Sequence, residues 1–187
     1  MVQEAKQYQV TIKGISPLMH NRYPIEEAGK PSTKTKGKVF NAKVNVEKCL
    51  YKTVNGDIYQ PSDHIEGALI EVGSTIIKSG RKSFKDDMKT NIQINPQEIP
   101  FTNGKEYTVD IRIGVIPATG GRVPIARPRW DTWQFTFTIT VFSPDEIAGE
   151  TLKTLLETAG KTKGIGTYRP KFGRFEVTTF EEIKKIK

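Results

Sequence analysis

The chain has 187 residues, 36% of them hydrophobic, and its 29 Lys and Arg against 21 Asp and Glu give a formal net charge of +8. This length fits one domain with insertions. Nine Phe and two Trp supply enough apolar area for one core, which argues against a fully disordered chain. The basic balance favours a polyanionic partner, either nucleic acid or an anionic membrane surface.

The cysteine content and the N-terminus bear on the compartment. Cys49 is the single cysteine, so no disulfide framework is expected within the chain, which fits a reducing compartment. The first residues are polar and lack the apolar segment of a signal peptide. No apolar run approaches the ~20 residues of a membrane span. We therefore expect a cytoplasmic protein without membrane contacts.

The first half of the chain predicts a strand and a helix separated by a basic segment. Tyr8, Val10 and Ile12 alternate with polar residues, as in a half-buried strand. Residues 20–48 are rich in Lys and poor in apolar residues, which indicates a mobile basic loop or a solvated linker. Apolar residues then recur at helical spacing and predict a helix over 62–76 with Ser62 as its N-cap. Residues 78–91 predict a second basic loop or an exposed helical piece.

The clearest pattern is a pair of long alternating segments, 107–116 and 131–142. We expect them to pair as a hairpin, because sequential strands usually do. Their connection, 117–130, is long for a hairpin and carries Arg122, Arg127 and Arg129, with no acid before Asp131.

The last third predicts a second helix and a final strand. Ser143, Pro144 and Glu146 form a capping-box start for a helix over 144–159, which Gly160 would end. Alternation near Phe175 suggests the final strand. The order strand, helix, strand, strand, helix, strand predicts an α+β fold, a ferredoxin-like (RRM-like) split βαβ antiparallel sheet with helices on one face. We expect one domain, 1–187, with long basic insertions at about 20–48 and 78–106.

Residues 161–174 form the segment with the strongest functional signal. Glycines there expose backbone N–H groups and allow close approach of an anion, Lys and Arg surround them, and Tyr168 and Phe172 offer rings to bases. A cradle for backbone phosphates is predicted; a glycine-rich turn after a helix is the alternative. A phosphate-binding loop of a nucleotide enzyme is not expected, because this segment follows a helix instead of opening one. The residues predicted to bind nucleic acid come from this segment, from the Arg-rich connection 117–130 and from the 20–48 loop. They are Arg22, Arg122, Arg127, Arg129, Trp130, Lys163, Gly164, Gly166, Tyr168, Arg169, Lys171, Gly173 and Arg174.

Three segments resemble the RAMP superfamily, the repeat-associated RNA-binding proteins of CRISPR effector complexes. They are Gly164-Ile165-Gly166 with Gly173 beyond it, the segment Lys13–Leu18, and the segment Tyr59–Leu69. The first resembles the family's glycine-rich loop, the second its first strand and exit, and the third the start of the first helix in backbone subunits. The connection 117–130 lies where those subunits carry a protruding thumb. The chain is most similar to a backbone-type subunit that occurs alone.

The resemblance implies binding of single-stranded nucleic acid, RNA in preference to DNA, with self-association along the strand. Some members are metal-independent endoribonucleases that use a histidine, and His20 is the candidate for that role in this chain. A mimic of a CRISPR subunit that acts through protein contacts is a further alternative. We expect a binding protein without catalytic residues, because a lone histidine needs a geometric partner for acid–base chemistry. No metal site or cofactor is expected, since Cys49 and two histidines do not form a zinc site at any recognised spacing.

Overall fold

The computed structural model describes residues 4–25 and 40–183 and has an α+β fold with antiparallel sheets. The main sheet has the strand order β11-β1-β10-β7-β3, and β6 also pairs with β10. Its strands are β1 (Lys6–Gly14), β3 (Tyr59–Pro61), β6 (Ile92–Asn95), β7 (Glu98–Asn103), β10 (Gln134–Val141) and β11 (Phe175–Glu182). The expected α+β class is thereby confirmed.

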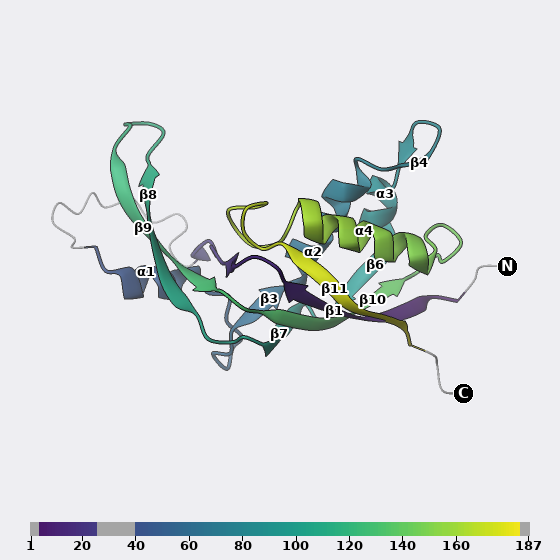
Figure 1. Ribbon diagram of the computed structural model, residues 1–187, viewed down its shortest axis with the longest axis horizontal. Coiled ribbons are helices and arrows are strands. Elements are labelled where there is room, and N and C mark those ends of the chain that lie inside the picture. Colours follow the sequence, from purple (N-terminus) through teal and green to yellow (C-terminus); the bar gives the residue numbers. More distant parts are fainter. Residues whose placement is uncertain (1–3, 26–39, 184–187) are drawn as a thin grey trace.

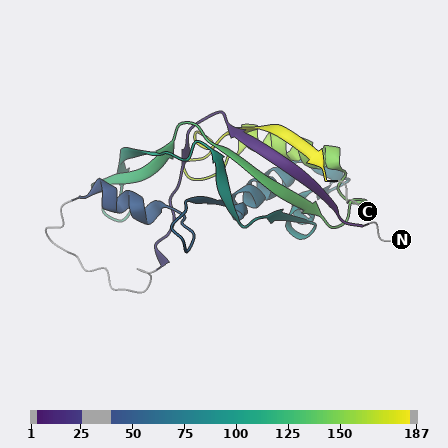
Figure 2. The ribbon, with the colours of Figure 1, turned by 90° about the horizontal axis from the view of Figure 1, so that it is seen from below.

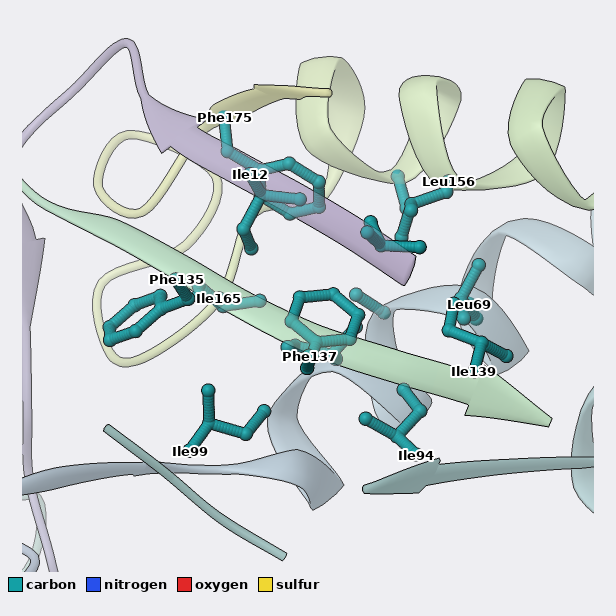
Figure 3. Close-up of a cluster of buried hydrophobic side chains, with 14 of the residues drawn as sticks. Ile12, Leu69, Ile94, Ile99, Phe135, Phe137, Ile139, Leu156, Ile165 and Phe175 are labelled. Atoms are coloured by element: carbon teal, nitrogen blue, oxygen red, sulfur yellow. The ribbon is translucent and has the colours of Figure 1, made fainter. Parts of the chain in front are cut away.

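Two amphipathic helices, α2 (Ser62–Gly73) and α4 (Gly149–Thr162), pack on the main sheet. Alternation along β1 and β10 points one set of side chains, including Val10, Ile12 and Phe137, into a single apolar cluster with both helices. Figure 3 shows Leu69 of α2 and Leu156 of α4 meeting these strands. The opposite side of β1 and β10 is polar, with Thr11 and Thr136 joined by their hydroxyls at 3.1 Å.

A second sheet forms a hairpin that projects from one end of the molecule (Figure 1). It consists of β2 (Leu18–Met19), β9 (Arg122–Trp130) and β8 (Thr108–Val115), in that order. The β8–β9 hairpin is antiparallel along its whole length, from Thr108 opposite Arg129 to Val115 opposite Arg122. The short helix α1 (Ala42–Cys49) packs against β9 and β8.

A third, small unit lies at the other end of the long axis, as Figures 1 and 2 show. It consists of the two-stranded ribbon β4 (Ile77–Ser79) and β5 (Lys82–Ser83), followed by α3 (Lys85–Thr90). The predicted basic loop or helical piece at 78–91 is therefore a ribbon and a short helix. Beyond it, β6 and β7 belong to the main sheet, so only the first half of the predicted insertion 78–106 lies outside that sheet.

The predicted hairpin of 107–116 with 131–142 is wrong. The first segment, β8, pairs with β9, which occupies most of the expected connection, and the second, β10, pairs with β1, β6 and β7. Pro124 and Pro128 hide the strand character of β9 in the sequence, because proline lacks the N–H that a ladder uses. In β9 both prolines lie within the strand, opposite Ile113 and Val109.

Both predicted helices exist, but their ends differ. Ser143 and Glu146 do not cap α4, which begins at Gly149, because tertiary contacts engage them: Ser143 bonds to the side chain of Asn91, and Glu146 pairs with Lys78. Gly160 lies inside α4 and not after it; a Cβ there would come within 2.2 Å of the carbonyl oxygen of Phe175. Likewise, α2 begins at Ser62 without a side-chain cap and ends at Gly73.

The predicted basic loop at 20–48 is only partly described. Residues 42–48 belong to α1, with Asn41 capping the amide of Val44 at 3.2 Å, and 26–39 lie outside the described residues. In the part of the chain that the structure describes, no helix is long and apolar enough to cross a membrane.

Candidate nucleic-acid interface

The segment between α4 and β11, residues 163–174, is called here the Gly-rich loop. It leaves α4 through Gly164, at φ 68°, whose amide bonds back to the carbonyl of Ala159 at 2.9 Å. Such a left-handed glycine ends many helices. Ile165 then turns into the core (Figure 3) and is fully buried. The loop is thus anchored to the core at the point where it leaves the helix.

The glycines of the loop are needed for its own path. Gly164, Gly166 and Gly173 all have positive φ. A Cβ on Gly173 would lie 1.8 Å from the carbonyl oxygen of Ile165, and one on Gly166 would lie 2.4 Å from that of Met19. The alternative interpretation, a turn that requires glycine, therefore accounts for these positions without a ligand, and Gly164 rather than Gly160 ends the helix.

Several backbone amides of the loop are already used. Those of Ile165, Thr167 and Gly173 donate to the carbonyls of Gly173, Met19 and Pro17 at 2.8–2.9 Å. The amides of Gly166, Tyr168, Arg169 and Lys171 have no acceptor among residues 4–25 and 40–183. The N–H groups left for an anion therefore lie between Gly166 and Lys171.

The β8–β9 hairpin and the Gly-rich loop meet through two arginines and two rings. The guanidinium carbon of Arg127 lies 4.4 Å from the centre of the Tyr168 ring. That of Arg112 lies 4.7 Å from the ring of Phe172 and 5.5 Å from that of Tyr168. Guanidinium groups at these distances from a ring attract its π face. We call these four residues the junction cluster.

Asp110, on the same strand as Arg112, holds two arginines of the hairpin in place. Its carboxylate accepts from Arg112 at 2.6 and 3.0 Å and from Arg129 at 3.4 Å. The hydrogen bonds from Arg112 hold the pKa of the Asp110 carboxyl below its usual value. Arg129 also pairs with Asp131 at 2.7 Å. The hairpin therefore presents arginines with restricted rotamers.

Arg127 is held on its other side by the segment after β2. Its Nε donates to the side-chain oxygen of Asn21 at 3.2 Å. Its Nη1 is buried and has no hydrogen-bond partner in the described part of the chain. A buried donor without an acceptor is costly, so this nitrogen is a candidate for an incoming acceptor.

The remaining cations predicted to bind nucleic acid differ in their ion pairing and in their exposure to solvent. Arg169 pairs with Glu71 of α2 at 2.9 Å and reaches the carbonyl of Gly164 at 3.5 Å. Lys171 and Arg174 are exposed, Lys163 is half-buried, and Arg122 is exposed at the start of β9. Arg22 is half-buried, and its amide bonds to the carbonyl of Cys49 at 3.0 Å. Arg169 thus bridges the loop to α2, and Lys171 and Arg174 project outward.

Of the three aromatic residues predicted to stack on bases, only Tyr168 is accessible. Its side chain is 39% exposed, whereas Phe172 is buried and Trp130 is completely buried. The Trp130 indole donates to the carbonyl of Lys105 at 3.1 Å and packs against Phe101 and Tyr107. The assignment of Trp130 to base stacking is therefore corrected: it is a core residue at the base of the hairpin.

His20, the candidate catalytic residue, lies in the core beside Trp130. Its ring is fully buried, and that burial lowers its pKa to about 3. Gln60 Nε2 donates to the carbonyl of Pro61 at 3.1 Å, so its Oε1 accepts from His20 Nε2 at 3.0 Å. Gln60 Nε2 also donates to His64 Nδ1 at 2.8 Å. His20 is accordingly a neutral structural residue in this conformation, shielded from solvent.

His64, in the first turn of α2, is half-buried. Burial lowers its pKa, and nearby Arg169 adds to the effect. It lines a hollow of about 220 Å³ between α2 and the Gly-rich loop, with Asp63, Gly67, Gly166 and Arg169. Among the residues that line this hollow, Asp63 is the one carboxylate, and none is a Ser, Thr or Cys nucleophile.

Sequence reasoning missed Asp110 and Arg112. In an alternating strand, Asp110 and Arg112 occupy the positions expected to face solvent. The charge pair at i and i+2, which lies on one face of a strand, was the available signal. Among the described residues, no group of three or more metal-ligating side chains is present.

Comparisons with known proteins give a similarity of fold. No family model matches the sequence, and a search of curated proteins finds no match. Among solved structures, 89 chains match. One comes from the structure described as "Cryo-EM structure of the Type III-B Cmr-beta bound to cognate target RNA", with a TM-score of 0.54 and 14% identity. The match covers 97% of this chain and 61% of that chain, so this chain spans less than two thirds of its neighbour.

Proposed function

We propose that this protein binds single-stranded RNA, mainly through backbone phosphates, at the junction between the β8–β9 hairpin and the Gly-rich loop. The fold supports this proposal. In the main sheet the last strand lies beside the first, the first beside β10, and β10 beside β6 and β7, with α2 and α4 as crossover helices. We propose that this order is a form of the ferredoxin-like split βαβ arrangement, within a single RAMP-like domain over 1–187.

The observation that carries the proposal is the junction cluster. Tyr168 is an exposed ring backed by the guanidinium of Arg127. Proteins that grip single strands combine such rings, on which bases stack, with cations that neutralise phosphates. Asp110 holds Arg112 in place, and less rotamer freedom is then lost when a phosphate binds.

Phosphate contacts would come from both sides of the cluster. On the loop, Lys163, Lys171 and Arg174 are cations with no ion pair to any residue of the described ranges. The unbonded amides of Gly166, Tyr168, Arg169 and Lys171 add neutral donors. On the hairpin, Arg129 shares the face of Arg112 and Arg127 and extends the same basic surface, whereas Arg122 lies opposite Val115 on the other face. Contacts of this kind do not depend on base identity, so binding would be sequence-tolerant and sensitive to salt.

RNA is preferred over DNA in this proposal because the neighbour of similar fold comes from a structure of Type III-B Cmr-beta bound to cognate target RNA. A grip on phosphates does not itself sense the 2′-hydroxyl. Assembly of several copies along one strand is part of the proposal, because the resemblance to RAMP backbone subunits implies it.

The deciding test compares two double variants that each remove two positive charges. Arg112→Gln with Arg127→Gln changes the junction cluster, and Arg81→Gln with Lys82→Gln changes the β4–β5 ribbon at the other end of the molecule (Figure 1). Affinity for a labelled RNA of mixed sequence, measured by fluorescence anisotropy, should fall at least ~10-fold for the first variant only. Equal losses would indicate a diffuse basic surface and overturn the site.

The same samples distinguish binding from cleavage. Labelled RNA incubated with the wild type in EDTA should stay intact, since His20 is buried and neutral. Cleavage that disappears in a His20→Gln variant would favour the endoribonuclease alternative. If the wild type has no measurable affinity for RNA even at low salt, the remaining alternative is a mimic of a CRISPR subunit that acts through protein contacts.

A further inference from the structure

One face of β8 carries a continuous apolar stripe that stays exposed, although α1 packs against the hairpin, mainly on β9. The stripe consists of Val109, Ile111, Ile113 and Val115, which are 42, 54, 65 and 62% exposed. These residues alternate along the strand and therefore point to the same side of the hairpin. Contiguous exposed apolar side chains of this kind mark interaction surfaces more often than they mark a water-facing sheet.

The same strand is also an open edge. In the order β2-β9-β8, β9 is paired on both sides over part of its length, whereas β8 pairs with β9 alone. Edge strands are normally protected against further pairing by Lys, Pro or a bulge. β8, with the sequence TVDIRIGV, has no Lys, Pro or bulge over eight residues, and its register with β9 is unbroken. Its two charged residues, Asp110 and Arg112, pair with each other.

We propose that two copies of this chain pair through β8, antiparallel, about a two-fold axis at Ile111. Pairing continues the β9–β8 sheet into the second copy and places the two apolar stripes side by side on one face. The shared face then holds Val109, Ile111 and Ile113 from each copy, which pack across the axis as cross-strand neighbours.

The charges on the strand select this register. Opposite residues must lie on the same face, so only registers that keep the two stripes together are allowed. With Ile111 opposite itself, Asp110 of each copy faces Arg112 of the other. A shift by one pair in either direction would place Asp110 opposite Asp110 or Arg112 opposite Arg112, and like charges directly opposite are destabilising. The central register is the one that is complementary in both charge and apolarity.

This contact leaves the proposed RNA interface open. Tyr168 and Phe172 lie on the Arg112 side of the hairpin, and the stripe is on the other side. The contact is isologous, so its symmetry closes it at two copies. The inference rests on the edge and the stripe and does not require that the protein binds RNA; an array along RNA would use other surfaces.

Site-specific cross-linking tests the register. In a Cys49→Ser background, Ile111→Cys should form a covalent dimer on mild oxidation, because opposite Cα atoms lie about 4.5–5.5 Å apart. Val109→Cys alone and Ile113→Cys alone should not, since identical residues there are about 13 Å apart. A mixture of these two variants should cross-link, because Val109 faces Ile113 across the axis. All samples are nuclease-treated first, so the outcome is independent of RNA binding.

The association itself is tested by light scattering after size-exclusion chromatography. The wild type should be a dimer whose melting temperature rises with protein concentration, and Ile111→Lys should be a cooperatively folded monomer whose melting temperature does not, because this side chain is half exposed. A monomeric wild type would overturn the proposal. So would Val109→Cys cross-linking alone as readily as Ile111→Cys, which would mean random collision or another register.

Discussion

The guanidinium of Arg127 lies 4.4 Å from the centre of the Tyr168 ring and joins the β8–β9 hairpin to the Gly-rich loop across 41 positions of sequence. Tyr168 itself has φ 58°, an uncommon value for a residue with a side chain. The loop therefore holds this ring in a conformation that costs free energy, and it does so where the ring is exposed beside arginines. Unusual backbone conformations are frequent at binding sites.

Replacing Tyr168 tests whether this ring stacks on a base. Tyr168→Ala should weaken RNA affinity by about 1–3 kcal/mol, the usual value of one base–aromatic stack, and Tyr168→Phe should keep most of the affinity. Fluorescence anisotropy at a fixed salt concentration measures both. Phe142→Ala, which removes another exposed ring just after β10, is the control and should bind normally. A Tyr168→Phe variant as weak as Tyr168→Ala would point to the hydroxyl instead.

Replacing Asp110 tests whether the hairpin arginines must be held in place. Asp110→Asn makes the protein more positive by one charge, yet we expect affinity for RNA to fall by a few-fold, about 1 kcal/mol, because Arg112 and Arg129 lose their shared carboxylate. Asp86→Asn, an exposed acid on α3, should leave affinity unchanged or raise it slightly. Tighter binding by Asp110→Asn would show that net charge outweighs position.

Alternation and helical spacing were enough to predict the α+β class and the existence of both long helices. Strand partners could not be predicted, because pairing depends on tertiary packing: the strand character of β9 is hidden by Pro124 and Pro128, and β10 lies beside β1 from the far end of the sequence. The apolar pattern of a strand is set by neighbouring residues, whereas the strand it pairs with can come from a distant part of the sequence.

The sequence predicted the part of the candidate site that lies in the Gly-rich loop. It did not predict the part formed by the face of the β8–β9 hairpin. Glycines, Lys and Arg at 161–174 mark the Gly-rich loop by composition alone. Burial is invisible in a sequence, so Trp130 and Phe172 read as stacking rings although both are packed inside. The ion pair from Asp110 to Arg112 became meaningful only when the loop was seen beside it.

Three glycine variants separate backbone strain from steric conflict. Gly67 lies in α2 with nothing near its Cβ position, so Gly67→Ala should be neutral or stabilise by up to about 1 kcal/mol. Gly56 has φ 86° in open space, so Gly56→Ala should cost about 1 kcal/mol through strain alone. Gly166→Ala adds a Cβ 2.4 Å from the Met19 oxygen and should cost more than Gly56→Ala. Urea unfolding gives the order, and a Gly166→Ala variant as stable as the wild type would contradict this account of the loop.

The pH dependence of stability should follow His20. Burial lowers its pKa from 6.5 to about 3, so the unfolded chain binds a proton below pH 6.5 that the folded chain rejects. The contribution of neutral His20 is therefore fully present above pH 6.5 and is lost as the pH falls toward 3. Lowering the pH from 7.5 to 5 should reduce the free energy of unfolding by about 2 kcal/mol from this group alone.

The lowered pKa of His64 acts in the same direction, so the wild type should lose somewhat more than His20 alone predicts. Urea unfolding at pH 7.5 and pH 5 of the wild type and of His20→Gln isolates the His20 part. Gln can donate to Gln60 as the imidazole does, but it does not titrate. The variant should lose about 2 kcal/mol less than the wild type between the two pH values. Equal losses in both proteins would mean that His20 accepts a proton in the folded state, through an opening of the Trp130 region that the present conformation does not have.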